Sequence, residues 1–154
     1  MKITIISIGK FENSLHRLTF EHYLKRMKWR VELKEIELKN AHNLSIEQIK
    51  DGEGKLILKA LKSGSVNIAL DEKGTQFSSQ NFAKLLSNFA LQGNSSLTFI
   101  IGGSNGLSEE VLNHCKIKIS LGLMTFPHLM VRTILLEQLY RAWSINASHP
   151  YHKE

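Results

Sequence analysis

Residues 97–106 read Leu-Thr-Phe-Ile-Ile-Gly-Gly-Ser-Asn-Gly, and this stretch decides the fold. Its first half, residues 97–101, is apolar and carries several β-branched side chains, which is typical of a buried strand. Its second half has the spacing Gly-Gly-x-x-Gly, which predicts a turn with open backbone N–H groups. Ligands in open α/β sheets bind beyond the carboxyl ends of the strands. The stretch therefore predicts either a ligand-binding turn or a tight strand-to-helix turn without a ligand.

The glycines match neither of the two common phosphate-binding motifs. A dinucleotide fingerprint needs Gly-x-Gly-x-x-Gly and an acidic residue after a second strand. A phosphate-binding loop needs Gly-Lys-Ser or Gly-Lys-Thr after its glycines. Neither pattern occurs here, so a small-molecule nucleotide-binding protein of these types is disfavoured.

Apolar runs and amphipathic stretches alternate on both sides of this segment. Strands are predicted at residues 3–8, 31–37, 66–70 and 117–121. Helices are predicted from residue 13 or 14 to 28, at 45–62, from 78 or 79 to 91, after Ser108, and at 127–143. This alternation predicts an α/β fold, with a mostly parallel sheet and flanking helices. No repeat or linker interrupts it, so we expect one domain over residues 1–154.

Two local features modify this pattern. Residues 71–74 read Asp-Glu-Lys-Gly and predict a turn that ends the strand at 66–70. Gly52 and Gly54 fall inside the second helix, where each costs roughly 1 kcal/mol relative to alanine. We expect this helix either to begin later or to pack closely against another element.

The chain has 154 residues, a net charge of +6 and a pI of about 9.5. A basic surplus favours nucleic acid as a partner, although a soluble basic protein has the same composition. Cys115 is the only cysteine, so no internal disulfide forms and a reducing compartment is expected. We find no leader peptide and no membrane-spanning run, which predicts a cytoplasmic location. The histidines show no metal-ligand spacing, so no metal is predicted.

Residues 120–128 read Ser-Leu-Gly-Leu-Met-Thr-Phe-Pro-His and form a mostly apolar loop before the last helix. An exposed apolar loop needs cover from a ligand, a partner chain or another segment. Pro127 suits the first position of a helix. His128 then lies at the positive end of the helix dipole, which keeps its imidazole neutral, as a base or acceptor requires. The alternative is a histidine that only caps or packs.

The last helix is apolar on nearly every side. A helix of this kind is buried all round, and a small sheet covers only one side of it. The other side predicts a partner, for which a homodimer is the simplest choice. His128 and Arg132 lie one turn apart on one face, whereas Glu137 and Arg141 are interpreted as a surface ion pair. The tail at 149–154, His-Pro-Tyr-His-Lys-Glu, is rich in aromatic and titratable groups.

Six segments in this order resemble one known family. They are residues 1–10 (Met-Lys-Ile-Thr-Ile-Ile-Ser-Ile-Gly-Lys), 69–71 (Ala-Leu-Asp) with Gly74, 99–107 (Phe-Ile-Ile-Gly-Gly-Ser-Asn-Gly-Leu), 124–128 (Met-Thr-Phe-Pro-His), 136–143 (Leu-Glu-Gln-Leu-Tyr-Arg-Ala-Trp) and 149–152 (His-Pro-Tyr-His). Together they resemble the SPOUT methyltransferases of bacteria that methylate N3 of a pseudouridine in helix 69 of 23S rRNA. The resemblance spans nearly the whole chain. It implies a single SPOUT methyltransferase domain whose C-terminal part is threaded into a trefoil knot, which general rules on unknotted chains would not suggest.

The resemblance also implies the ligands and the site. It implies S-adenosylmethionine as cofactor, a homodimer, and 23S rRNA in the ribosome as substrate. The residues implied around the cofactor are Leu70, Gly102, Leu121, Gly122, Leu123, Met124, Thr125 and Phe126. The residues expected near the target base are His128, Tyr151 and His152, and any of them is a candidate for the proton acceptor. Arg132 is expected to bind phosphate or to stabilise the developing anion. Two other functions stay open, namely a SPOUT methyltransferase that acts on tRNA and a non-catalytic ribosome-binding factor.

Overall fold

The computed structural model describes residues 1–12 and 15–152, and for His152 it describes the backbone only. The sheet has five strands, in the order β2-β1-β4-β3-β5, and every pair is parallel. The strands are β1 (Lys2–Ile8), β2 (Arg30–Ile36), β3 (Val66–Gln76), β4 (Ser96–Ile101) and β5 (Ile117–Ser120). The prediction of an α/β fold with a mostly parallel sheet is confirmed.

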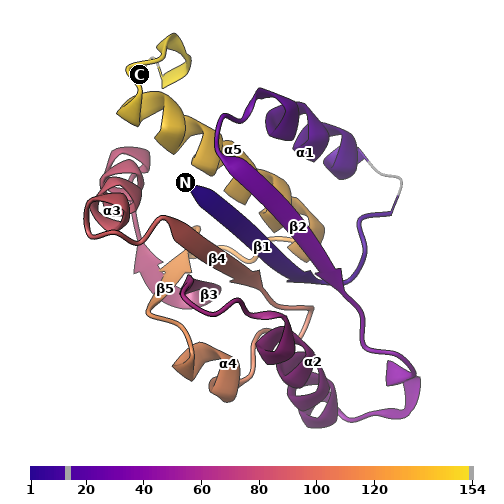
Figure 1. Cartoon of the computed structure of the whole chain (residues 1–154). Coiled ribbons are helices and arrows are strands. Elements are labelled where there is room, and N and C mark those ends of the chain that lie inside the picture. The colour runs from indigo at the N-terminus through magenta and orange to yellow at the C-terminus, as the bar shows by residue number, and fades with distance from the viewer. Residues whose placement is uncertain (13–14, 153–154) are drawn as a thin grey trace.

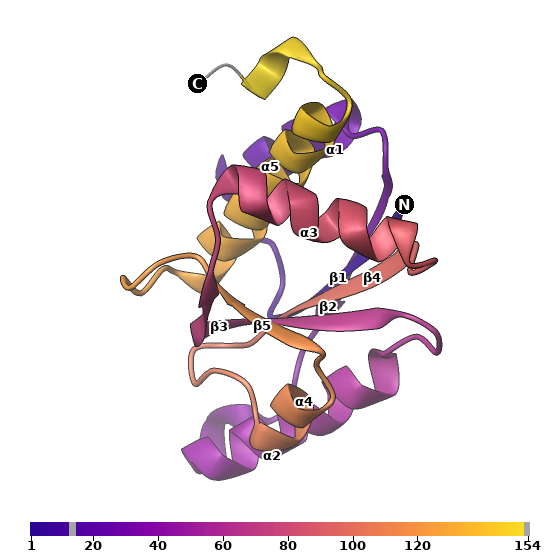
Figure 2. The ribbon, with the colours of Figure 1, turned by 90° about the vertical axis from the view of Figure 1, so that its left-hand side faces the viewer.

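The helices form a layer on each face of the sheet (Figure 1). Figure 2 shows α1, α3 and α5 on one face and α2 and α4 on the other. Their bounds are α1 (Leu15–Arg26), α2 (Ile46–Ala60), α3 (Ser79–Leu91), α4 (Glu109–Asn113) and α5 (His128–Asn146), with short 3-10 helices η1 (Ala41–Asn43) and η2 (Pro150–His152). The predicted start of the first helix at residue 13 or 14 lies outside the described residues.

Residues 97–101 form most of β4, the central strand of the sheet. Successive side chains of a strand point to opposite faces. Phe99 belongs to the core beneath α1, α3 and α5, whereas Ile100 belongs to the core beneath α2 and α4. Both side chains are fully buried. An uninterrupted apolar run is therefore what this position requires.

Serine side chains begin three of the helices, as the sequence predicts. The side chains of Ser45, Ser78 and Ser108 each accept a hydrogen bond from a backbone N–H in the first turn. The glycines of α2 reflect close packing and not a late start. A Cβ on Gly54 would overlap the Ser108 side chain at the head of α4, so only glycine lets these two helices meet.

Two predicted boundaries are wrong. Residues 71–74 do not end the third strand, because β3 continues to Gln76 and both Leu70 and Thr75 pair with Ile119 of β5. Residues 71–74 instead form an irregularity within β3, where the pairing shifts register and Lys73 N donates to Asp71 Oδ1 at 2.8 Å. Pro127 precedes the last helix instead of opening it, since its ψ of 131° is extended. The helix also continues one turn further, to Asn146.

The longest helix, α5, packs against the sheet and between α1 and α3. This arrangement buries most of its circumference within one chain, more than the sequence argument expected from a sheet alone. Within the described part of the chain, no helix is both long enough and apolar enough to cross a membrane.

Candidate functional site

The loops after β1 and β4 leave the sheet toward opposite faces. The chain goes from β1 to α1 on one face, and from β4 to α4 on the other (Figures 1 and 2). These strands are neighbours, so their carboxyl ends form a topological switch point, where ligands bind in open α/β sheets. Gly9 makes the turn after β1 with a φ of +84°, a conformation that favours glycine.

His128 and Arg132 of α5 lie against this turn. A Cβ placed on Gly9 would be 3.5 Å from Arg132 Nη2 and 3.7 Å from His128 Nε2. Burial lowers the pKa of His128, and the positive charge of Arg132 lowers it further. The imidazole is therefore neutral at pH 7, which agrees in direction with the sequence expectation. The structure adds two physical causes, burial and a neighbouring guanidinium, to the helix dipole.

The guanidinium of Arg132 is fully buried and bonded to the protein. Its Nη2 donates to the carbonyls of Ile8 at 2.5 Å and Gly9 at 3.0 Å, at the end of β1. Its Nη1 lies 3.3 Å from Glu35 Oε1, and the Phe11 ring lies 4.8 Å from its Cζ. The Nε atom has no hydrogen-bond partner among the described residues. Arg132 thus fixes the strand end beside His128, and in this conformation it does not reach solvent.

A cavity of about 250 Å³ opens between the ends of β3 and β5 and the helices α3 and α5. Its lining is Leu70, Gln76, Phe77, Ser79, Phe82, Phe99, Ile119, Ser120, Leu121, Ile134, Leu135 and Gln138. Two of the eight residues predicted to hold a cofactor, Leu70 and Leu121, therefore line it. The sequence reasoning did not identify the α3 and α5 contributions, because helix packing brings them there.

The rest of the apolar loop follows Ser120 and Leu121, which line the cavity. Ser120 Oγ donates to the Gly122 carbonyl at 2.8 Å and accepts from Gly122 N at 3.2 Å, which orders the start of the loop. Leu123 is 91% exposed and Met124 is 78% exposed, so their side chains lack the cover that the sequence argument required. Of the remaining predicted residues, Thr125 is exposed and Phe126 is half-buried.

Gly102 does not line the cavity. A Cβ on it would lie 2.8 Å from the backbone carbon of Gly106, so the glycines form a closed turn. Gly103 and Gly106 make a bridge, with Gly106 N donating to the Gly103 carbonyl at 3.0 Å. Of the two sequence interpretations of this turn, the tight strand-to-helix connection describes its geometry. Gly102 follows Ile101, which pairs with the cavity residue Leu70.

Glu53 of α2 is a residue that the sequence analysis missed. A Cβ on Gly103 would lie 3.1 Å from both Glu53 carboxylate oxygens and 3.1 Å from Ile8 Cγ2. The carboxylate therefore lies at the switch point, between the ends of β1 and β4. Burial raises the pKa of Glu53. No sequence signal marks this position, because the contact depends on how α2 packs across the sheet.

Replacing Glu53 with glutamine is expected to stabilise the protein at neutral pH. When burial raises the pKa of a carboxyl group in the folded protein, the free energy of unfolding decreases as the pH rises above the pKa in the unfolded chain, near 4.5. Urea unfolding at pH 4 and pH 7 measures this effect for both proteins. The stability gain of Glu53→Gln should be larger at pH 7 than at pH 4. A loss of stability at pH 7 would show that the ionised carboxylate has a favourable partner.

The tail packs on the other end of α5. Tyr151 OH donates to Glu137 Oε1 at 3.0 Å and lies 3.1 Å from Tyr23 OH. The guanidinium carbons of Arg26 and Arg141 lie 5.3 and 5.0 Å from its ring centre. Burial is the main reason that the pKa of Tyr151 is raised, so its hydroxyl stays protonated at neutral pH. The side chain of His152, another predicted catalytic residue, lies outside what the structure describes.

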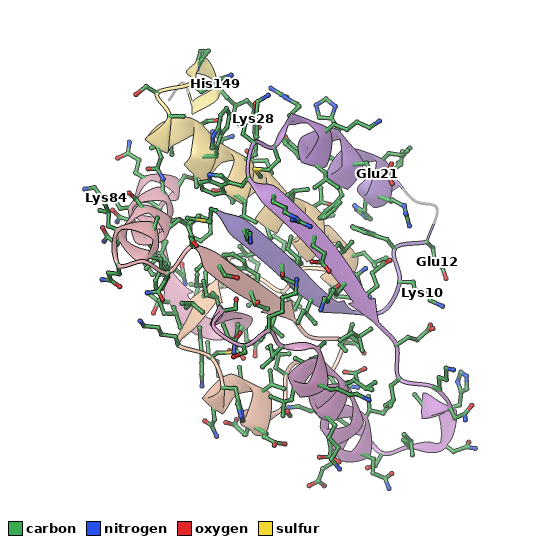
Figure 3. All side chains as sticks on the ribbon, in the orientation of Figure 1. Lys10, Glu12, Glu21, Lys28, Lys84 and His149 are labelled. Carbon is green, nitrogen blue, oxygen red and sulfur yellow. The ribbon has the colours of Figure 1, made fainter. Side chains whose placement is uncertain are left out.

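Among the described side chains, one chain does not bring Tyr151 together with His128 and Arg132. His128 begins α5, whereas Tyr151 contacts Glu137, which lies further along the same helix. This places the two catalytic candidates about 14 Å apart along the helix axis at 1.5 Å per residue. Figure 3 places Lys10, just after β1, well apart from His149 in the tail. The structure thus groups His128 with Arg132, and Tyr151 with Tyr23 and Glu137. In the described part of the chain, no three His, Cys, Asp or Glu side chains are placed to hold a metal ion.

Comparisons with known proteins identify the family. The sequence model of a family described as "Predicted SPOUT methyltransferase" matches residues 1–152. The chain is 47% identical to a "Ribosomal RNA large subunit methyltransferase H" of Clostridioides difficile strain 630, and 45% identical to that of Clostridium botulinum strain Langeland. Each alignment covers 99% of this chain and 100% of the relative.

A solved structure shares the fold. It is a probable methylase family protein from Haemophilus influenzae Rd KW20, at 15% sequence identity and a TM-score of 0.58. The match covers 99% of this chain and 70% of that one. The family model over residues 1–152 and the two full-length relatives, at 47% and 45% identity, show the family. The chain belongs to the SPOUT methyltransferase family.

Proposed function

We propose that this protein transfers a methyl group from S-adenosylmethionine to N3 of a pseudouridine in helix 69 of 23S rRNA. The observation that carries this proposal is the 47% identity, over the whole chain, to a protein named as a large-subunit rRNA methyltransferase. The assembled ribosome in the cytoplasm is the proposed substrate. The described residues fold around one five-stranded sheet, and recognition of an assembled RNA shape suits such a compact unit.

The cavity beside β3 and β5 suits this cofactor. Leu70, Phe77 and Leu121 offer apolar surface for a purine, and Ser79 and Gln138 offer polar groups. The exposed side chains of Leu123 and Met124 belong to the loop that would cover a bound molecule. We therefore assign cofactor binding to Leu70 and to residues 121–126, with Gly102 supporting the turn beside them. S-adenosylmethionine, when bound, supplies an electrophilic methyl group on a sulfonium.

The residues of this chain then have to bind the base and take up the N3 proton. His128 is neutral and lies at the switch point, so it is able to accept a proton. Arg132 is a positioning residue in this proposal, because its guanidinium holds the carbonyls at the end of β1. Tyr151 and His152 remain candidates for contact with the base. Holding the base and the methyl donor in line contributes roughly 7–11 kcal/mol in favourable cases.

A homodimer resolves the separation between His128 and the tail. Within one chain Tyr151 lies against Glu137 and not against His128, so a site that uses both takes the tail from the partner subunit. The exposed Leu123 and Met124, and the half-buried Met130 and Ile134, provide an apolar surface for that contact. The trefoil knot of the family also belongs to this proposal. The two separate pairings of β3 with β5 and the loop that follows β5 lie in the part of the chain where a knot is expected.

The basic end of α1 provides a surface for RNA. Lys25, Arg26, Lys28 and Arg30 are all exposed, and Arg26 lies over the Tyr151 ring. Figure 3 shows Lys28 at the same end of the molecule as His149. Cations beside aromatic rings are typical of surfaces that bind phosphate and stack on bases.

Labelled S-adenosylmethionine tests the function directly. We expect label in assembled ribosomes, little in free rRNA and none in tRNA, and the label should map to a pseudouridine. Label in tRNA would move the substrate to another RNA while keeping the chemistry. No label in any RNA, together with no cofactor binding by calorimetry, would leave a non-catalytic ribosome-binding factor.

A further inference from the structure

A chain of side-chain hydrogen bonds runs from the cavity to the tail. Ser79 Oγ donates to Gln138 Oε1 at 2.8 Å, and Gln138 Nε2 donates to Glu137 Oε2 at 2.7 Å. Tyr151 OH donates to the other carboxylate oxygen, Glu137 Oε1, at 3.0 Å. Ser79 and Gln138 both line the cavity, whereas Tyr151 belongs to the tail. The cavity and the tail are therefore joined by three consecutive hydrogen bonds.

Glu137 and Arg141 are not a plain surface ion pair, which corrects the sequence interpretation. Glu137 also accepts hydrogen bonds from Gln138 and Tyr151. Its side chain is 17% exposed and that of Arg141 is 30% exposed. Arg141 donates to Glu137 Oε1 through Nε at 3.0 Å and Nη2 at 2.7 Å. With Gln138 and Tyr151 added, the carboxylate accepts from three side chains. Each of these donors is thus held in place by one charged group.

The carboxylate also orients the amide of Gln138. An amide has a donor end and an acceptor end, and the negative charge of Glu137 requires the donor end. The acceptor end, Oε1, consequently turns toward Ser79 and the cavity wall. A ligand with hydroxyl or ammonium donors, both of which S-adenosylmethionine carries, would meet an oxygen of fixed direction. Binding there polarises the amide and strengthens its bond to Glu137.

We propose that Gln138 and Glu137 are positioning residues that couple occupancy of the cofactor cavity to the placement of Tyr151. This inference rests on the proposed function, since it needs a cofactor in that cavity. Coupling between two sites is reciprocal. If the cofactor favours the docked tail by some factor, the docked tail raises cofactor affinity by the same factor, and loss of the Tyr151 hydroxyl should weaken both effects.

A double-mutant cycle on the full-length protein tests the coupling without turnover. The probe is S-adenosylhomocysteine, which lacks the transferable methyl group, and its Kd is measured by calorimetry. Tyr151→Phe is expected to weaken binding about 3- to 10-fold, the range of one lost hydrogen bond. In the Gln138→Leu background, the same change should alter Kd less than about 2-fold, because the connection is already broken.

Two further variants make the cycle specific. Ser79→Ala removes only the hydrogen bond between Ser79 and Gln138, and it serves as the milder change if Gln138→Leu does not fold. Asn146→Ala is the matched control, since Asn146 Nδ2 donates to the Ala83 carbonyl at 3.1 Å and braces α5 to α3 without touching Glu137. The effect of Tyr151→Phe should persist in full in that control background.

Hydrogen exchange of the tail provides the second measurement. S-adenosylhomocysteine should slow amide exchange at residues 147–152 in the wild-type protein and leave it unchanged in Gln138→Leu. Additive effects of Tyr151→Phe and Gln138→Leu, with normal ligand binding, would overturn the coupling and leave the proposed function intact. A wild-type protein that binds no S-adenosylhomocysteine would overturn both.

Discussion

Arg132→Met is expected to lower the free energy of unfolding by about 3–5 kcal/mol, as for other buried ion pairs that lose one partner. The guanidinium is 0% exposed and makes two carbonyl hydrogen bonds and an ion pair with Glu35. Methionine fills a similar volume but leaves the carbonyls of Ile8 and Gly9 without this donor. Glu35 loses its cationic partner and keeps the backbone N–H of Phe11. Urea unfolding followed by circular dichroism gives the difference.

Lys55→Met is the control for this experiment. Lys55 pairs with Asp51 on the surface of α2, where the two side chains are 69% and 56% exposed. Exposed pairs of this kind contribute about 0.2–1 kcal/mol. If Arg132→Met were no more destabilising than Lys55→Met, the buried guanidinium would not be what holds the end of β1.

His128→Gln is expected to reduce methyl transfer about 10²–10⁴-fold, the usual contribution of a general base. Glutamine keeps a polar side chain of similar reach but accepts no proton at neutral pH. The Kd of S-adenosylhomocysteine should change little, because His128 does not line the cavity. Single-turnover rates on ribosomes and calorimetry separate the two effects. A normal rate would exclude His128 as the base.

The pH dependence of the wild-type rate follows from the same residue. The pKa of His128 is lowered by burial and by Arg132, so protonation occurs below its ordinary value of 6.5. The rate should therefore stay level from pH 8 to about 6.5 and decrease at lower pH. A decrease that begins well above pH 6.5 would indicate another titrating group.

His152→Ala alone is expected to reduce turnover more than cofactor affinity, and an unchanged rate would remove His152 from the mechanism.

Mixed dimers test whether the tail serves the partner subunit. When His128→Gln and His152→Ala proteins exchange subunits, half of the dimers carry one intact site, so roughly a quarter of the wild-type activity should return. No recovery on mixing would place the tail in the site of its own subunit.

Local sequence chemistry predicts most of the elements. Apolar runs with β-branched residues mark the strands, and Ser45, Ser78 and Ser108 mark helix starts, because a strand face and a helix cap depend on nearby residues only. The same reasoning misplaced the end of β3, because the strand resumes its pairing with Ile119 at Thr75, after the irregularity at residues 71–74. It also underestimated how much of α5 the chain itself covers.

The candidate site likewise has some features that the local sequence predicts and others that depend on tertiary packing. From the sequence, the apolar loop at 120–128 and a neutral His128 follow directly, since composition and the helix start determine them. Only the tertiary structure shows that Arg132 is buried beneath the end of β1, or that Glu53 faces the switch point.

The tertiary structure also joins Gln138 to Tyr151 through Glu137. These contacts connect residues from different elements, whose meeting depends on strand order and helix packing. The periodicity of a single chain carries no information about that order. Local residue patterns therefore specify most of the elements and the character of the apolar loop, whereas strand order and helix packing select the side chains that share the site.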